Sequence, residues 1–113
     1  MKREIEIKKE PLEIFTAVNT KTLGIASNKL TPLGYKLYTY LVGNQDGYKW
    51  NLDSTAYAKW QGVYKKDLSE KEIKAITDLM GKQIKSGMKD LIEKGYMREI
   101  SKNKFIFSSN GQF

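Results

Sequence analysis

The side chains that most often carry catalysis or bind metals are sparse in this sequence. It contains no histidine and no cysteine, which removes imidazole bases, thiolate nucleophiles, thiolate zinc sites and disulfides. Its 13 acidic residues are mostly interleaved with lysine, and no pair stands in an apolar context that would raise a carboxyl pKa. A tyrosine nucleophile usually needs a bound metal ion, and the sequence has no acidic cluster that could hold one. We therefore expect no catalytic residue, no metal site, no cofactor and no small-molecule substrate, and hence no enzyme.

The most informative remaining feature of the sequence is its excess of basic residues. The 113 residues include 20 lysines and arginines, which gives a net charge of +7 and a pI near 9.5. Seven basic and three acidic residues lie between Lys82 and Lys104, a local net charge of +4. Such an excess favours a polyanionic partner, with nucleic acid ahead of acidic protein or anionic lipid. No apolar run is long enough to span a bilayer, so we expect no membrane partner.

The first candidate contact surface lies on a helix predicted over Lys82–Lys94. At 100° per residue, the apolar side chains Ile84, Met88, Leu91 and Ile92 fall on one side of this helix. The opposite half is basic and polar in its first two turns, and we expect Gln83, Ser86 and Lys89 to meet base edges there. The candidate residues of this helix are Lys82, Gln83, Lys85, Ser86 and Lys89.

The second candidate surface is the tip of a β-hairpin predicted over residues 96–107, which turns about Lys102 and Asn103. In the predicted register Ile100 opposes Phe105. The polar, basic tip is expected to hold phosphate or the minor groove. The candidate residues are Arg98, Lys102, Asn103 and Lys104, and the residues expected to share the apolar face are Tyr96, Ile100, Phe105 and Phe107.

Shorter elements must position these two surfaces. Residues 2–8 fit either a short strand or a frayed extension, residues 13–18 have strand-like composition, and residues 23–30 are predicted to form a loop. Thr31 and Pro32 predict the start of a helix that ends at Gly43. A turn is predicted at residues 46–47 and a short helix over residues 54–61.

The C-terminal half is predicted to hold two helices before the hairpin. Ser69 and Glu72 have the spacing of a capping box and open the first of them. Gly81 is predicted to interrupt the helical run, and Gly95 to end the second helix. Residues 109–113 are expected to form a loose tail.

Residues 72–97, EIKAITDLMGKQIKSGMKDLIEKGYM, resemble the helix-turn-helix of winged-helix DNA-binding proteins, including bacterial multiple-antibiotic-resistance-type repressors. Residues 28–60, NKLTPLGYKLYTYLVGNQDGYKWNLDSTAYAKW, are similar to winged-helix domains of phage and plasmid replication initiators. The resemblance implies a recognition helix that enters the major groove N-terminus first. Lys74 and Asp78 depart from the pattern, in which Ala and Gly are usual.

Two registers of the helix-turn-helix remain open. In one, the turn lies at Gly81. In the other, residues 58–63 belong to the first helix, and residues 65–80 form an insertion before the recognition helix. Both registers keep Lys82–Lys94 as the helix that contacts DNA.

These observations predict a single α+β domain over residues 1–113, a winged helix-turn-helix in which residues 1–10 are a possible extension. The expected function is non-enzymatic, sequence-specific binding of double-stranded DNA in the cytoplasm. The resemblance implies a role in replication initiation or conjugative DNA transfer of a plasmid or phage. A homodimer, or paired copies on repeated sites, is expected. The alternatives are a winged-helix transcriptional repressor and a protein-interaction module of a replication or transfer complex.

Overall fold

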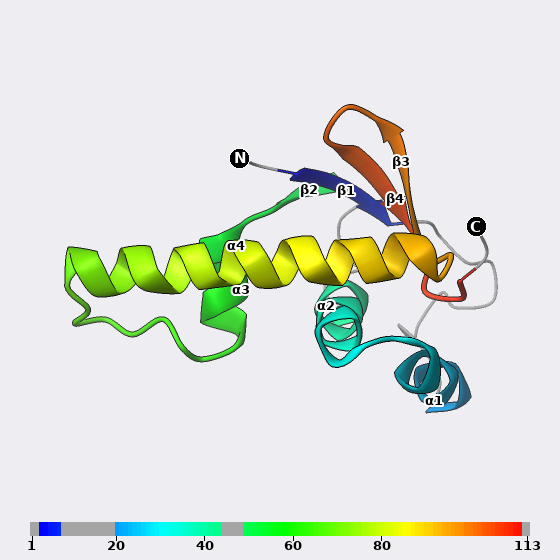
Figure 1. The fold of residues 1–113 in the computed structure, drawn as a ribbon, viewed down its shortest axis with the longest axis horizontal. Helices are drawn as coiled ribbons and strands as arrows, with labels where there is room; N and C mark the ends of the chain where they lie inside the picture. The colour runs from blue at the N-terminus through cyan, green and yellow to red at the C-terminus, as the bar shows by residue number, and fades with distance from the viewer. Residues whose placement is uncertain (1–2, 8–19, 44–48, 112–113) are drawn as a thin grey trace.

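A computed structural model describes residues 3–7, 20–43 and 49–111 of the chain. These residues form four helices and four strands, and the strands belong to one sheet. The predicted α+β class, a helical bundle followed by a C-terminal β-hairpin, is confirmed (Figure 1). In chain order the elements are β1 (Arg3–Ile7), α1 (Thr20–Lys29), α2 (Pro32–Gly43), β2 (Lys49–Leu52), α3 (Ser54–Trp60), α4 (Glu70–Glu93), β3 (Met97–Ser101) and β4 (Lys104–Phe107).

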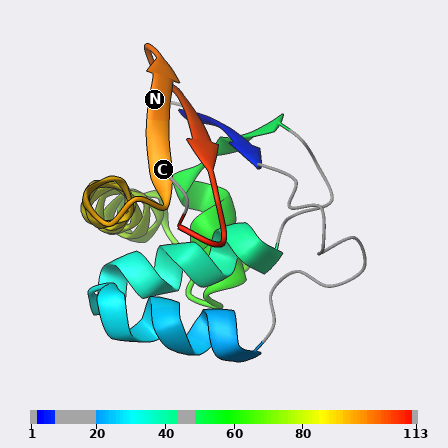
Figure 2. The ribbon, with the colours of Figure 1, turned by 90° about the vertical axis from the view of Figure 1, so that its right-hand side faces the viewer.

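The sheet has the strand order β2-β1-β4-β3. β3 and β4 form the antiparallel hairpin, and β1 lies parallel to β4 with Ile7 opposite Phe107. β2 pairs antiparallel with the other edge of β1. The sheet lies on one side of α4, with α1 and α2 on the other side (Figures 1 and 2). The N-terminal segment is therefore an inner strand that completes the sheet of the hairpin.

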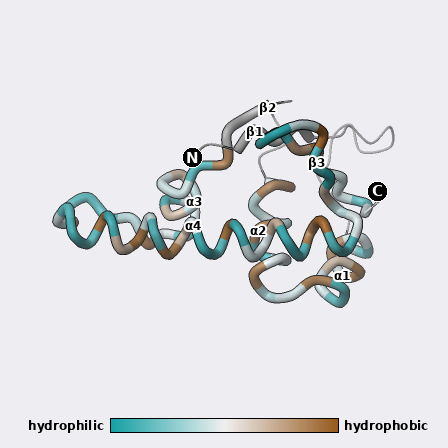
Figure 3. Tube along the Cα trace, turned by 45° about the horizontal axis from the view of Figure 1, so that its top comes forward, coloured by the Kyte–Doolittle hydropathy of each residue, from teal (hydrophilic) through white to brown (hydrophobic). Residues whose placement is uncertain are grey.

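The longest element, α4, is one continuous helix of 24 residues. The predicted capping box is confirmed: the Ser69 hydroxyl accepts a hydrogen bond from the Glu72 N–H at 3.2 Å, and the Glu72 carboxylate accepts one from the Ser69 N–H at 3.3 Å. The predicted end is also confirmed, since Gly95 has a φ of +84° and the next N–H returns to the Leu91 carbonyl at 2.8 Å. The apolar stripe of α4 is buried against the rest of the protein. In Figure 3 the tube of α4 accordingly alternates between hydrophilic and hydrophobic segments.

The predicted interruption at Gly81 is wrong. A glycine inside a helix costs only about 1 kcal/mol relative to alanine, and the apolar positions on both sides of Gly81 follow one stripe. Met80 and Ile84 are both buried on that stripe, so packing favours continuing the helix. The register with a turn at Gly81 is therefore excluded. The other register is also wrong in treating residues 65–80 as an insertion, because residues 70–80 belong to α4. The helix before α4 is α3, and residues 61–69 connect the two.

The segment predicted as a loop over residues 23–30 belongs mostly to α1, which ends at Lys29. Gly24, Ser27 and Asn28 suggested a loop, but Ala26 is fully buried and Leu30 is nearly so. These two residues are four positions apart and form an apolar edge that packs on the core. Tertiary packing thus outweighs a weak helical preference in this segment.

The hairpin forms where it was predicted, but its register differs. Glu99, not Ile100, lies opposite Phe105, and a bulge between Glu99 and Ser101 displaces Ile100 from the ladder. As a result Ile100 is 49% exposed and does not share the buried face with Phe105 and Phe107. An extra residue in one strand reverses the side-chain alternation beyond it.

The tail after the hairpin is packed rather than loose through residue 111. Ser109 is buried, and its carbonyl accepts a hydrogen bond of 2.7 Å from the Tyr38 hydroxyl. The Ser108 N–H donates to the Tyr96 carbonyl at 2.8 Å. The expectations for residues 13–18, 46–47 and 112–113 lie outside the described residues.

The core lies where α2, α4 and the sheet meet. Tyr38 stands at its centre, with its ring edge-on to Tyr96 and Phe107 at centroid distances of 5.4 and 5.6 Å. Gly87 lets α4 approach α2 closely: a Cβ added there would lie 3.0 Å from the Leu33 carbonyl oxygen. The largest fully buried side chains are Tyr38, Tyr57, Phe107, Leu37, Leu41, Leu52, Ile84, Leu91 and Met97.

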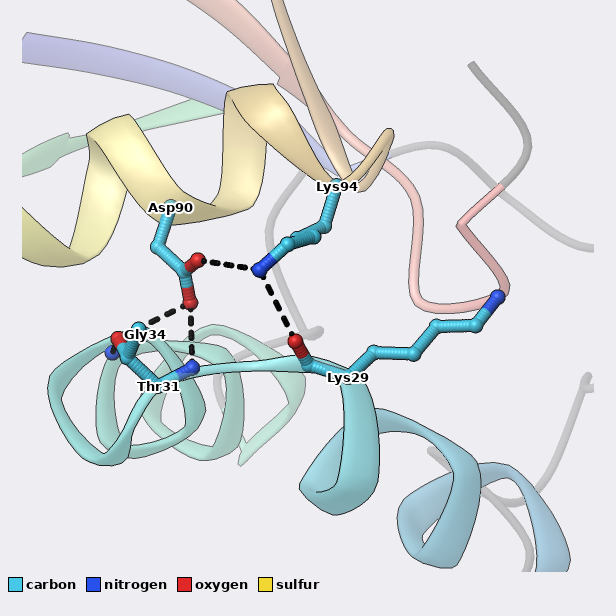
Figure 4. A network of polar contacts seen from close by, with 5 residues as sticks. All are labelled: Lys29, Thr31, Gly34, Asp90 and Lys94. Atoms are coloured by element: carbon cyan, nitrogen blue, oxygen red, sulfur yellow. Dashed lines mark hydrogen bonds and ion pairs between the residues drawn. The ribbon is translucent and has the colours of Figure 1, made fainter.

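A buried carboxylate, Asp90, and its ion-pair partner Lys94 join the end of α4 to α2 and α1 (Figure 4). Asp90 Oδ2 accepts hydrogen bonds from the Thr31 N–H at 2.7 Å and from the Thr31 hydroxyl at 3.0 Å. Asp90 Oδ1 pairs with Lys94 Nζ at 3.1 Å, and Lys94 Nζ also donates to the Lys29 carbonyl at 3.1 Å. Asp90 therefore caps the start of α2 while Lys94 caps the end of α1, which fixes how α4 lies across both.

Replacing this carboxylate should produce a stability loss that depends on pH. Burial alone would raise the pKa of Asp90, but hydrogen bonds from Thr31 and Lys94 outweigh it and lower the pKa below its ordinary value. A carboxylate of lowered pKa stabilises the fold above its unfolded pKa, and that contribution is lost as pH falls through the folded pKa. We expect Asp90→Asn to reduce the free energy of unfolding by about 1–3 kcal/mol at neutral pH.

Urea unfolding of the parent and of Asp90→Asn, followed from neutral pH to about pH 2, measures this effect. The difference between the two proteins should be constant at neutral and mildly acidic pH and should shrink below about pH 4. A difference that stays the same over the whole range would show that the charge of Asp90 is not what stabilises the contact.

Candidate nucleic-acid interface

The C-terminal half of α4 carries an exposed basic face. Lys82, Lys85, Ser86 and Lys89 are all exposed, and at 100° per residue they fall within an arc of about 100°. The three lysines form no ion pair with any residue in the described ranges, in contrast to Lys94, which is paired with Asp90. This face therefore presents three lysines without ion pairs to the solvent, and Glu93 is the acidic residue of this half of α4 that falls within the same arc.

Gln83 does not share this face, and its predicted projection beside the lysines is wrong. It is only partly exposed, and its side-chain oxygen Oε1 is buried without a hydrogen-bond partner among the described residues. Gln83 lies one helical turn before Gly87, the position at which α4 packs closely on α2. Contact with base edges would then fall to Ser86 and to the lysines around it.

Ile92 also departs from its predicted place, since it is 43% exposed rather than buried with Ile84 and Leu91. It lies at the edge of a hollow of about 670 Å³ between α4 and β4. Met88 and Phe105 provide further apolar lining, and lysines of the basic face line the same hollow. The lining residues are Lys85, Ser86, Met88, Lys89, Ile92, Glu93 and Phe105.

The hairpin presents its predicted residues at the tip and on the edge strand. Lys102 and Lys104 are exposed at the turn, and Arg98 is exposed on β3. Asn103 adopts a φ of +61°, and its N–H donates to the Glu99 carboxylate at 3.4 Å. Asparagine tolerates this left-handed conformation better than most residues, so it suits the turn. The basic face of α4 and the β4 residue Phe105 line the same hollow, so this face lies beside the strand that begins at Lys104.

The direction in which α4 could meet a duplex differs from the expectation. Lys82 is the thirteenth residue of α4, because the helix begins at Glu70. About 18 Å of helix precedes Lys82 at 1.5 Å per residue, and Glu70 and Glu72 lie in its first turn. The expectation that Lys82 lies at the N-terminal end of its helix is therefore wrong. A duplex would have to lie along the side of α4.

The signal that sequence reasoning missed was the unbroken apolar spacing across Gly81. Ile73, Ile76, Met80, Ile84 and Leu91 are three, four or seven residues apart, which is the spacing of one continuous helical stripe. The hollow, in contrast, had no local signal, because Met88 and Phe105 come from elements that meet only in the fold.

Residues 3–7, 20–43 and 49–111 lack two further features. No group of three or more acidic, histidine or cysteine residues is placed there to hold a metal ion. No helix in these ranges combines the length and the hydropathy needed to cross a bilayer.

The resemblance to winged-helix DNA-binding proteins rests on sequence patterns in residues 28–60 and 72–97. The interface described above rests on the exposed face of α4 and on the hairpin beside it. Comparison of the chain with protein-family models, with curated proteins and with solved structures found no match.

Proposed function

We propose that this protein binds double-stranded DNA through the basic face of α4 and the tip of the hairpin. The observation that carries the proposal is the row of three exposed lysines, Lys82, Lys85 and Lys89, on one face of a rigid helix and without ion pairs among the described residues. Neutralising phosphates and releasing their counterions is the dominant source of affinity for such a surface.

The dimensions of α4 suit the major groove. A helix with its side chains is about 10–12 Å across, and the groove is about 12 Å wide. Lying lengthwise, α4 would direct Ser86 toward base edges, with the lysines reaching guanine acceptors or phosphates. Lys102 and Lys104 at the hairpin tip would hold phosphates and so set the orientation of the protein on the duplex.

The hollow between α4 and β4 supports passage of one DNA strand between the helix and the hairpin. Its lining combines the apolar side chains Met88, Ile92 and Phe105 with two lysines and one carboxylate, so the lining has a net positive charge. The charged residues are Lys85, Lys89 and Glu93. A nucleic-acid strand alternates in the same way, with the C–H groups of its sugars beside charged phosphates. The apolar lining would contact sugars while the lysines neutralise phosphates.

The biological context of this binding is proposed on the sequence resemblance. It favours replication initiation or DNA transfer of a plasmid or phage, and repression of transcription would use the same surface. The position of the bound site, at an origin or at a promoter, distinguishes these roles. Because one module of this size offers few base contacts, we also propose binding as a homodimer or as paired copies on repeated sites.

A second candidate function is docking of a protein partner at Trp60. This side chain is 45% exposed although its ring packs at 5.0 Å from Tyr40 and 5.8 Å from Tyr57. Aromatic side chains held rigidly at the surface are favoured at protein interfaces. Trp60→Ala would then abolish capture of the partner while leaving duplex binding unchanged.

The salt dependence of binding tests the proposed function. The proposed interface would neutralise about five or six phosphates, so log K should fall with log salt at a slope of about −5. The basic residues counted are Lys82, Lys85, Lys89, Arg98, Lys102 and Lys104. Fluorescence anisotropy of a labelled duplex, titrated at several salt concentrations, measures this slope. Absence of binding at low salt, or a slope near zero, would contradict the proposal.

A further inference from the structure

We propose that the DNA-contacting surface continues along α4 to Lys71 and Lys74, two residues that precede the predicted recognition helix. This inference rests on the proposed function, because it assigns further phosphate contacts to the same helix. The surface is called the α4 lysine row, and it consists of Lys71, Lys74, Lys82, Lys85 and Lys89.

The row exists only because α4 is continuous. At 100° per residue its five lysines fall within an arc of about 80°, and it extends over about 27 Å from Lys71 to Lys89. A turn at Gly81 would have broken this alignment and separated the two halves. All five lysines are exposed, and none forms an ion pair with a residue in the described part of the chain.

The five lysines of the row outnumber the acidic residues spaced to pair with them along α4, so this face keeps a net positive charge. Three pairs of like charges stand three or four residues apart, at Lys71/Lys74, Lys82/Lys85 and Lys85/Lys89, and such pairs destabilise an isolated helix. Lys71 also lies in the first turn, where the helix dipole disfavours a cation. Asp78 lies four residues from both Lys74 and Lys82, and Glu70 and Glu93 lie four residues from Lys74 and Lys89. These opposite charges at helical spacing offset part of the repulsion. An external polyanion would supply the missing counter-charge.

The geometry favours a duplex over an anionic membrane as that polyanion. A helix that binds a membrane surface lays its apolar face into the lipid. The apolar face of α4 is already used, since Ile84 and Leu91 are fully buried in the core. A straight helix of this length leaves the curved floor of the major groove near one end. Lys71 and Lys74 would therefore meet phosphates at the groove margin and contribute equally to all sequences.

The test is the double variant Lys71→Gln/Lys74→Gln, made in the full chain. If each lysine contributes one phosphate contact, affinity for duplex DNA should fall about 60-fold at about 0.1 M salt, and the salt slope should flatten by about 1.8. Glutamine and lysine have similar helix propensities, so α4 should persist, and circular dichroism verifies this. The matched control is Lys65→Gln/Lys66→Gln, which removes the same charge from the exposed loop before α4.

A third variant is expected to bind duplex DNA more tightly, a result that loss of folding could not produce. Asp78→Asn removes the acidic residue from the middle of the row, so it should tighten binding and steepen the salt slope. Weaker or unchanged binding by this variant would count against the row.

The outcomes separate this inference from the proposed function. An unchanged slope for Lys71→Gln/Lys74→Gln, with impaired binding when Lys82, Lys85 and Lys89 are replaced, would overturn the extension alone. If the variant and the loop control lose the same duplex affinity, the effect comes from net charge alone. That result would also overturn the extension to Lys71 and Lys74. No binding of the parent to duplex, with binding to phosphatidylserine vesicles that requires Lys71 and Lys74, would overturn both proposals and assign the row to a lipid surface.

Discussion

Replacing Gly34 by alanine is expected to destabilise the fold by about 2–4 kcal/mol. Gly34 is buried at the start of α2, where a Cβ would overlap the Asp90 carboxylate at Oδ2. To relieve the overlap, Asp90 must withdraw from its hydrogen bonds to Thr31, or α2 must move away from α4. The first response leaves donors at the start of α2 without their acceptor, and the second opens the core around Leu37 and Leu91.

Urea unfolding of Gly34→Ala beside the parent measures this loss. The matched control is Gly24→Ala in α1, where an added Cβ has no described atom within 4 Å. That change should be neutral or stabilise the protein by up to about 1 kcal/mol, because alanine favours the helix. Equal stability of Gly34→Ala and the parent would mean that α2 and α4 are not fixed by this contact.

The largest functional effect is expected from replacing the three lysines of the basic face together. In the counterion-release description each phosphate contact contributes about 0.9 to the slope of log K against log salt. At about 0.1 M salt this amounts to roughly eightfold per contact, so Lys82→Gln/Lys85→Gln/Lys89→Gln should weaken duplex binding about 500-fold. The slope should flatten by about 2.7. The fold should be retained, since all three side chains are exposed.

The control for this variant removes equal charge elsewhere. Lys21, Lys65 and Lys66 are exposed outside α4, and their replacement by glutamine should change affinity only slightly. Anisotropy titrations of both triple variants at matched salt give the comparison. If the two variants lose affinity equally, the protein attracts DNA by its total charge, and the basic face is not a specific surface.

Local sequence signals correctly predicted the helix ends and turns that depend on residues close together in the chain. Ser69 and Glu72 marked the start of α4, Thr31 and Pro32 the start of α2, and Gly95 the end of α4. Each depends on hydrogen bonds or backbone angles within a few residues. Residues 102–103 likewise marked the turn of the hairpin, because a tight turn has few alternatives.

The sequence-based predictions were wrong where contacts between residues far apart in the chain determine the local structure. Gly81 stays helical because Met80 and Ile84 pack on other elements, and α1 forms because Ala26 reaches the core. Gln83 turns toward the body of the protein because α2 crosses α4 one turn later, at Gly87. None of these contacts is visible in a local pattern. The exposed positions of Lys82, Lys85 and Lys89 could be predicted, since they lie opposite the strongest part of the apolar stripe.

The parallel pairing of β1 with β4 has a consequence for folding during synthesis. Ile7 lies opposite Phe107, so this ladder cannot close on the ribosome until residue 107 has left the exit tunnel. The helices and their contacts can form earlier, because they join residues closer together in the chain. Ladder closure over so long a chain separation is slow. In a nascent chain β1 could therefore pair with β2 first, and its other edge would stay open to chaperones until β4 is available.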